Sequence, residues 1–548
     1  MRSSVPSHKT KGSDLRPFKG EPDGMSADAA PSGNRLFIKK SVDQIQREAA
    51  GHALKRTLGP INLVFLGIGC IIGAGIYVMT GNAAANFAGP GVMLSFVIAG
   101  LACAFAGLCY AELASTMPVA GSAYTYSYAT LGEVIAWTMG WLLVLEYGVA
   151  AATVAVGWSG YAVSFLKDFG ITIPPELSSS MIQSITGPEG GLTFQMTSSF
   201  NLVAALGILA VTLLLVLGIS ESASVNNVIV VIKVGVLLAF IAMGVFFINS
   251  DNWTPFIPPN EGGFTYGVEG VFRAASVIFF AYVGFEAVST AAGEAKNPQK
   301  DMPFGILGSL FICTAIYILV AAVLTGVVPY RELGVPEPIA VAVDRMGMPW
   351  FSFLIKVGAI AGLTSVMLIL TYGQTRVFYA MARDGLLPRL FSTLHQSFRT
   401  PWIGTLVLGA LIAVASSMLP ITILGDLVSL GTACAFAIVC VSVLWLRKAR
   451  PDLVRPFTAP GGAVIPILGI VFAFIMAAPL IADIFIKASS GDPIPAIILG
   501  SYIALGALIY LVYGMRNSRL ARGLPQVDDE GDPTPLEAIR EGVGDTRE

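Results

Sequence analysis

Long apolar segments alternate with short polar segments along most of this chain. A helix that crosses the hydrocarbon core of a bilayer needs about 20 largely apolar residues. Backbone polar groups cannot be left unpaired in lipid, so such segments are expected to be helices. The pattern predicts twelve of them, near residues 62–82, 90–116, 134–166, 201–219, 225–248, 268–293, 304–328, 350–378, 402–419, 422–446, 464–487 and 494–515.

Composition supports a membrane protein. Of the 548 residues, 55% are hydrophobic and 12% are charged, and the mean hydropathy is +0.73. Soluble domains contain about 25% charged residues, and a soluble protein this apolar would expose large apolar patches to water. The lipid bilayer is therefore the expected surrounding. The net charge of −2 identifies no partner by itself, and no nucleic acid partner is expected.

Lysine and arginine are distributed unevenly between the two sets of loops. With both termini in the cytoplasm, 25 of the 33 basic residues fall in cytoplasmic segments. This bias predicts a multi-pass protein of the cell membrane with both termini cytoplasmic. Residues 1–60 form a cytoplasmic N-terminal segment, residues 61–515 the transmembrane domain, and residues 516–548 a charged, disordered tail in the cytoplasm.

The first predicted helix contains a cluster of glycines. Residues 67–77 read GIGCIIGAGIY, and each glycine weakens a helix by about 1 kcal/mol relative to alanine. Close packing against a neighbouring helix and an unwound binding site both explain the cluster. A nucleotide-binding loop is excluded, because no strand precedes the segment.

The sixth predicted helix, five helices later, reads FFAYVGFE at residues 279–286. Transporters built from two inverted repeats bind their substrate between the first helices of the two repeats, which are both interrupted at mid-membrane. An interruption frees N–H and C=O groups that need a polar ligand at that depth. A zwitterionic amino acid provides one, with its carboxylate on the N–H groups and its ammonium on the carbonyls.

Few ionisable residues lie in the apolar segments. Burying Lys233 in the fifth helix costs about 2.5–3.5 kcal/mol on insertion scales. Its side chain either snorkels to the inner interface or titrates in place of a coupling sodium ion. Thr364 and Ser365 are candidate partners in the second case. Glu146 either makes structural hydrogen bonds or faces the substrate side chain, whereas a structural role is favoured for Glu286 and Glu112.

Other chemistry is not indicated. The six cysteines lie in apolar segments without a disulfide pattern, and the three histidines lie in polar segments without a cluster of further ligands, so no metal site and no cofactor are expected. Neither HExxH nor GxSxG is present, and an enzyme is not predicted.

Several motifs resemble the amino acid–polyamine–organocation transporters, in particular their cationic amino acid transporter branch. They are LFIKK at 36–40, LKRTLG and GIGCIIGAGIYVMTG within 52–81, and FFAYVGFEAVSTAAGEAKNPQKDMP at 279–303. The resemblance covers about residues 35–515. It implies a five-plus-five inverted repeat, with repeats at about 61–248 and 268–446, and two extra helices at about 464–515.

The resemblance also implies residue roles. The substrate carboxylate would meet the backbone around Gly75, the ammonium would meet carbonyls of both breaks, and Phe280 would gate the pocket. Lys233 occupies the position at which proton-driven relatives carry a lysine in place of sodium. The substrate-binding residues implied are Ile71, Gly73, Ala74, Gly75, Ile76, Glu146, Phe280, Ala281 and Val283. Ala74 departs from the family pattern, since many relatives have a hydroxyl there.

The sequence thus predicts a secondary active amino acid transporter, a proton symporter that works by alternating access. An amino acid exchanger is the nearest alternative, and a receptor that senses amino acids is the next. The short terminal segments argue against the receptor, because they contain no pattern of a signalling domain. The sequence leaves open which amino acid is carried, the direction of transport, the oligomeric state and a small accessory membrane subunit.

Overall fold

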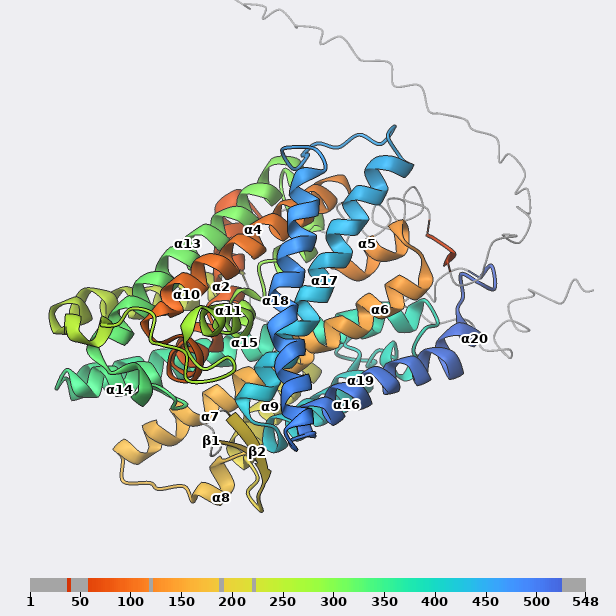
Figure 1. Ribbon diagram of the computed structural model, residues 1–548. Helices are drawn as coiled ribbons and strands as arrows, with labels where there is room; N and C mark the ends of the chain where they lie inside the picture. Colours follow the sequence, from red (N-terminus) through yellow and green to blue (C-terminus); the bar gives the residue numbers. More distant parts are fainter. Residues whose placement is uncertain (1–36, 41–57, 118–121, 187–191, 219–222, 525–548) are drawn as a thin grey trace, which may run out of the picture.

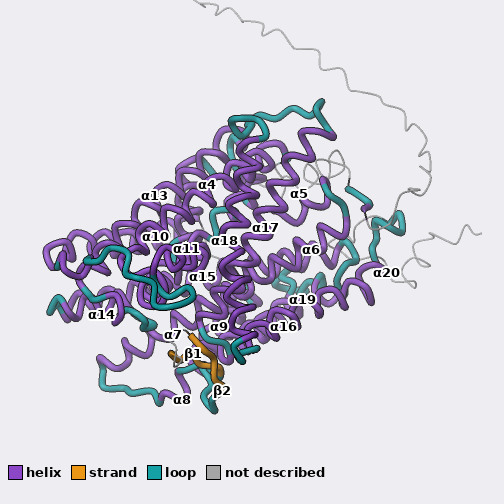
Figure 2. Tube along the Cα trace, in the orientation of Figure 1, coloured by secondary structure: helices purple, strands orange, loops and turns teal. Residues whose placement is uncertain are grey.

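The computed structural model describes residues 37–40, 58–117, 122–186, 192–218 and 223–524. Most of the predicted N-terminal segment, 1–60, lies outside the described residues, as does the tail from 525 onward. The described chain is almost entirely helical, and its helices pack side by side in one bundle (Figures 1 and 2).

Nine helical segments of the described chain are long and apolar enough to cross a membrane: Gly75–Thr116, Glu133–Asp168, Asn227–Phe247, Gly267–Ser289, Pro298–Val327, Pro349–Arg383, Ile421–Ala449, Val464–Ser489 and Ile494–Asn517. Three more apolar helices are shorter: Pro60–Ile71, Leu202–Val216 and Trp402–Met418. Each of the twelve predicted segments coincides with helix. The first of them is interrupted, and its second half continues without a gap into the next segment.

The elements of the first part of the chain are α2 (Pro60–Ile71), η2 (Gly75–Met79), α3 (Thr80–Ala83), η3 (Ala84–Ala88), η4 (Gly89–Gly91), α4 (Val92–Thr116), α5 (Ser122–Thr130), α6 (Glu133–Leu143), η5 (Val144–Val149), α7 (Ala150–Asp168), α8 (Pro175–Ser178), β1 (Ile182–Thr186), β2 (Leu192–Met196), α9 (Leu202–Val216), α10 (Ala223–Gly244), η6 (Val245–Phe247) and η7 (Ser250–Trp253). Here η2, η3 and η5 are π-helical turns.

The remaining elements are α11 (Gly267–Ile278), η8 (Phe279–Tyr282), α12 (Ala287–Thr290), η9 (Ala292–Glu294), α13 (Pro298–Val327), η10 (Tyr330–Glu332), α14 (Pro338–Arg345), α15 (Pro349–Arg383), η11 (Arg389–Phe391), α16 (Trp402–Met418), α17 (Ile421–Ala449), α18 (Val464–Ser489), α19 (Ile494–Ile509), η12 (Tyr510–Gly514) and α20 (Met515–Asn517).

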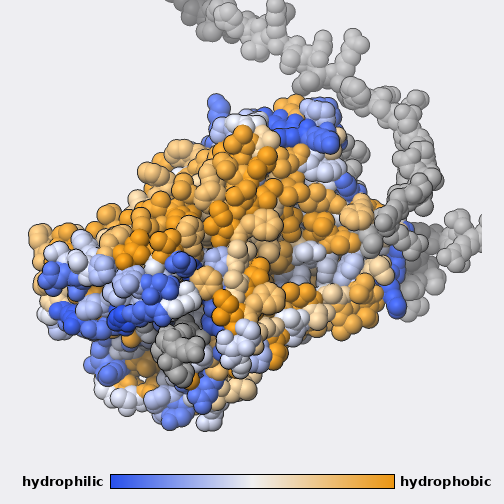
Figure 3. Space-filling view, viewed as in Figure 1, coloured by the Kyte–Doolittle hydropathy of each residue, from blue (hydrophilic) through white to orange (hydrophobic). Residues whose placement is uncertain are grey.

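The outer surface of the bundle is apolar. In Figure 3, hydrophobic residues cover the face formed by α4, α13 and α18, and polar residues gather toward the ends of the bundle. Large apolar side chains point outward, among them Phe246, Phe311, Phe474 and Phe485. A helix bundle with such a surface is a multi-pass membrane protein, as the composition predicted.

Small residues let the central helices approach closely. A Cβ on Gly67 of α2 would lie 2.3 Å from Oγ of Ser309 on α13, and a Cβ on Gly305 of α13 would lie 2.7 Å from Cβ of Leu63. Glycine is therefore required on both sides of this contact. Close packing of this kind is typical of membrane helices, which associate without a hydrophobic driving force.

The connector between α7 and α9 contains structure that the sequence did not predict. β1 and β2 pair antiparallel, with Ile182 opposite Met196. The backbone N–H of Phe194 in β2 donates to Asp492, which precedes α19, over 2.7 Å. The hairpin lies at one end of the bundle beside α8, and the loop after α17 lies at the other end (Figure 1).

The predicted tail starts later than expected, because residues 516–524 fold against the bundle. The hydroxyl of Ser518, which is fully buried, donates to the carboxylate of Glu133. The N–H of Arg519 donates to the carbonyl of Asp384 over 3.0 Å. A side chain of α6 and a backbone carbonyl just after α15 thus hold this segment in place.

The same end of the bundle contains buried ion pairs. Lys40 reaches the carboxylate of Asp384 over 2.6 Å, and both side chains are buried. Glu112 at the end of α4 accepts from Nε of Arg447 at the end of α17 over 2.8 Å, and from the N–H of Ala459 over 2.8 Å. Glu112 therefore has the structural role that the sequence favoured for it.

Removal of the Glu112 carboxylate should destabilise the fold. Glu112→Ala leaves the mostly buried guanidinium of Arg447 unpaired, which typically costs about 3–5 kcal/mol. Glu332→Ala is the matched control, because Glu332 and Arg345 are 55% and 46% exposed and such pairs contribute at most about 1 kcal/mol. The apparent unfolding temperature in detergent measures both, and equal shifts would contradict the assignment.

Candidate functional site

The first interruption lies directly after α2. The helix ends at Ile71, and Ile72 is extended, with φ −73° and ψ 98°. Two carbonyls of this break accept hydrogen bonds from one side chain: Nζ of Lys233 lies 3.0 Å from the Gly69 oxygen and 3.3 Å from the Ile72 oxygen. Lys233 is fully buried. Its ammonium thus binds the helix break and does not extend to the membrane interface.

The stem of Lys233 crosses from α10 over α15. A Cβ on Gly362 would lie 3.1 Å from Cγ and from Cε of Lys233, so glycine is needed for this path. Ser365 lies one helical turn further on the same face of α15. Thr364 instead accepts a hydrogen bond from Nε1 of Trp158 over 3.0 Å and donates to the Ile360 oxygen. That Thr364 and Ser365 assist the coupling site stays a prediction.

The second interruption follows η8. Val283 is extended, with φ −54° and ψ 131°, and Gly284 has φ +116°, a conformation that favours glycine. Both carboxylate oxygens of Glu286 accept from the Gly284 N–H, over 3.1 and 2.9 Å. The Phe280 N–H donates to Oγ of Ser429 on α17 over 3.2 Å. Polar side chains therefore bind part of the freed backbone here too.

The two interruptions lie against each other. A Cβ on Gly75 would lie 2.3 Å from Cα and Cβ of Ala281, which puts the two backbones in van der Waals contact. The hydroxyl of Tyr317 on α13 is 2.7 Å from the Ile71 oxygen and 3.1 Å from the Ala281 oxygen. A single phenol thus joins carbonyls of both breaks.

A small cavity lies between the breaks. It is lined by Cys70, Ile71, Gly73, Ala74, Gly75, Val154, Phe280, Val283, Val366 and Leu370. The N–H groups of Ala74, Gly75 and Ile76 belong to the first turn of the resumed helix, where they have no intrahelical acceptor. The geometry offers a carboxylate these N–H groups and leaves apolar walls for a side chain.

Most of the predicted substrate-binding residues lie at this cavity, and three do not line it. Ile76 and Ala281 are buried beside the lining residues, in η2 and η8. Glu146 lies in η5 and is also fully buried.

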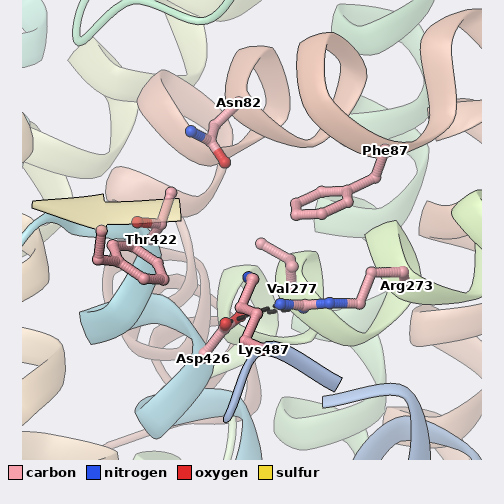
Figure 4. Close-up of a pocket in the computed structure, with 8 residues that line it drawn as sticks. Asn82, Phe87, Arg273, Val277, Thr422, Asp426 and Lys487 are labelled. Atoms are coloured by element: carbon pink, nitrogen blue, oxygen red, sulfur yellow. Dashed lines mark hydrogen bonds and ion pairs between the residues drawn. The ribbon is translucent and has the colours of Figure 1, made fainter. Parts of the chain in front are cut away.

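A second small hollow lies toward the end of the bundle that carries the hairpin (Figure 4). Arg273 of α11 projects into it and donates to both oxygens of Asp426 on α17, over 3.0 and 2.7 Å, and to Asp483 on α18 over 2.9 Å. Phe87 lies over the guanidinium at 4.8 Å. The cluster ties three helices together above the second break.

Sequence reasoning did not find this cluster. It named none of Arg273, Asp426 and Asp483 as site residues. Two aspartates within predicted helices were the available signal, because carboxylates in lipid-embedded segments require a partner.

Comparison with known proteins is consistent with this geometry. Residues 58–511 match the family model described as amino acid permease. The chain is 44% identical over 487 residues to the branched-chain amino acid permease BcaP of Bacillus subtilis, covering 88% of this chain and 99% of that protein. It is 42% identical over 487 residues, with the same coverage, to the methylthioribose transporter of that organism. Cationic amino acid transporter 4, vacuolar, of Arabidopsis thaliana is 38% identical over 421 residues, or 76% of this chain and 68% of that protein.

Addition of one methyl group at the contact between the breaks tests the site. Gly75→Ala should abolish uptake, because its Cβ would overlap Ala281 and force the two interrupted helices apart. Gly235→Ala on α10 is the matched control, since nothing lies within 4 Å of its Cβ. Uptake by Gly75→Ala at the rate of the control would show that the contact has no role.

Loss of the Arg273 cluster should loosen the bundle above the cavity. In Arg273→Gln, a cysteine introduced at Asn82, which lines the same hollow, should react at least about tenfold faster with an impermeant maleimide. Breaking a buried pair costs about 3–5 kcal/mol, and about 1.4 kcal/mol of this cost already gives a factor of ten. Arg331→Gln, which removes an exposed pair with Glu261, is the control background. Equal labelling rates in the two backgrounds would contradict this role.

Proposed function

Because the chain belongs to the amino acid permease family, we propose that it is a proton-coupled amino acid symporter that works by alternating access. The observation that carries the proposal is the cavity between two interrupted helices, with Lys233 bound to the carbonyls of the first break. Free N–H groups at one side of this cavity suit a carboxylate. The Lys233 ammonium binds the backbone of the first break, so gain or loss of its proton changes the hydrogen bonds of that break.

The proposed architecture has twelve crossings. The short helices α2, α9 and α16 each complete a crossing together with their neighbouring segments, which extends the nine long spans to the predicted number. Residues 61–248 and 268–446 form two inverted repeats, and residues 464–515 form the extra helices. The distribution of lysine and arginine places both termini in the cytoplasm of a cell whose plasma membrane holds the protein.

The proposed substrate class is neutral amino acids with apolar side chains. Val154, Val366 and Leu370 supply the walls of the cavity, and none of the described residues that line it is charged. A lysine or arginine substrate would bury an unpaired charge there, which is costly. The relative in Bacillus subtilis is named a branched-chain amino acid permease, which supports the same class.

Coupling follows from the bonds of Lys233. A protonated ammonium donates to the Gly69 and Ile72 oxygens and holds the break in one shape. Loss of the proton removes charge-assisted donors from both carbonyls. The break then changes its preferred shape, and with it the affinity for a carboxylate at the adjacent N–H groups. Binding of the amino acid and of the proton are thereby linked.

Uptake into proteoliposomes tests the function. A panel of labelled amino acids, measured with and without an inward proton gradient, should show accumulation of apolar amino acids that depends on the gradient. Lys233→Ala should lose this dependence, because the donors to the break are gone. Lys356→Ala is the matched control: Lys356 is a buried lysine of α15 that pairs with Asp168 over 2.8 Å, away from the break.

Two results would change the assignment. Uptake that depends on internal amino acid and ignores the proton gradient would favour an exchanger. Full gradient-driven uptake by Lys233→Ala would remove Lys233 from the coupling mechanism.

A further inference from the structure

The sixth span lies along one face of α17, and the proposed transport mechanism assigns no role to this contact. Asp426, Ser429 and Phe436 of α17 are separated by three and seven residues, which places them on the same side of the helix. Each of the three meets the sixth span at a different level. α17 therefore supports the interrupted helix along its length.

Contacts on both sides of Ser429 fix the two helices against each other. On one side, the carboxylate of Asp426 accepts two hydrogen bonds from Arg273 of α11, over 3.0 and 2.7 Å. On the other side, the ring centre of Phe436 lies 5.5 Å from that of Phe279, the first residue of η8. An ion pair and an aromatic contact thus determine where the Ser429 side chain meets the sixth span.

The hydroxyl of Ser429 binds the backbone at the point where α11 ends and η8 begins. It accepts from the Phe280 N–H over 3.2 Å and donates to the Val277 oxygen over 3.2 Å. In a 3₁₀ helix, an oxygen and an N–H three residues apart bond to each other directly. Here both groups bond to a side chain from another helix, and a side chain inserted in this way bends or opens a helix. Ser429 is fully buried, so bulk water does not compete for either bond.

The ring of Phe280 lies at the substrate cavity, and stacking does not fix its direction. Phe280 lines the cavity. The neighbouring Phe279 packs against the ring of Phe436. Within the described part of the chain, by contrast, no aromatic ring packs against that of Phe280. The direction of the Phe280 ring therefore depends on the backbone that carries it, and Ser429 binds the N–H of that backbone from another helix.

We infer that Ser429 is a positioning residue for Phe280: its hydroxyl fixes the backbone from which the Phe280 ring closes the cavity. Ser429 does not line the cavity itself, so it acts through Phe280. With both hydrogen bonds present, the ring covers a bound amino acid. Release of the Phe280 N–H frees η8 to turn and the ring to move aside. The inference deepens the proposed function, on which it rests, because it assigns a hydroxyl to the closure step of alternating access.

Uptake of a labelled branched-chain amino acid by the full-length protein in proteoliposomes tests this role. Ser429→Ala should raise KM about tenfold, or about 1.4 kcal/mol, and leave kcat nearly unchanged, because the closed form loses hydrogen bonds that the open form lacks. Ser429→Thr keeps the hydroxyl and should retain the wild-type KM. Ser442→Ala is the matched control: Ser442 is a fully buried serine of α17 whose hydroxyl has no hydrogen-bond partner among the described residues.

A purely structural hydrogen bond would give a different result. Its loss would reduce the amount of folded transporter, and with it the maximal rate, at an unchanged KM. An unchanged KM in Ser429→Ala, or a KM raised equally in Ser429→Thr, would overturn the inference. Should Ser429→Ala elute as an aggregate, Ser429→Cys takes its place, since a thiol is a weaker donor and acceptor. Its KM should then rise, and a wild-type KM would overturn the inference.

Labelling of Cys70 measures the closure without a transport assay. Cys70 lines the same cavity and is buried. Its modification by a small methanethiosulfonate reagent, located by mass spectrometry of the purified protein, should be about tenfold faster in Ser429→Ala than in the wild type or in Ser442→Ala. Equal rates in the three proteins would overturn the inference. If the wild type carries no amino acid, the proposed function fails, and the labelling rates still decide the role of Ser429.

Discussion

The structure depends on one constraint: a peptide group in lipid must have a hydrogen-bond partner. Two helices stop at mid-bundle, after Ile71 and after Tyr282, and each stop frees backbone groups. Side chains that reach across from other helices satisfy part of them. Lys233 comes from α10 and Tyr317 from α13. The interruptions are thus stable features of the fold, and the groups left over are available to a ligand.

Ion pairs lie at both ends of the bundle and hold the helices together there. Arg273 joins α11, α17 and α18 on the side of the hairpin. At the other end, Glu112 joins α4 to α17, and Lys40 joins the N-terminal segment to the end of α15. Between these two sets of ion pairs, the cavity is lined by apolar side chains and by backbone groups of the breaks. Under the proposed alternating access, a substrate that enters the cavity requires one of these sets of ion pairs to open.

Sequence patterns predicted much of this arrangement, because its causes are local. Glycines mark the first break, and a buried lysine in an apolar helix demands a partner. The partners of Lys233 could not be predicted, because every residue has a backbone carbonyl and the sequence does not indicate which of them accept a hydrogen bond. The side of the helix on which Glu146 lies could not be predicted either. The π-helical turn Val144–Val149 shifts the helical phase, so a regular periodicity of 3.6 residues does not give the position of Glu146. The hairpin was missed because two strands of five residues lie within a polar connector.

Side chains of opposite charge bind the backbone groups freed at the two breaks. The reason is that a peptide group has both a carbonyl acceptor and an N–H donor. The first break exposes carbonyls, and an ammonium binds them. The second exposes the Gly284 N–H, and the carboxylate of Glu286 binds it. Each partner can gain or lose a proton, and each bond is strongest in its charged form. The hold on each break therefore depends on the charge of the side chain that binds it.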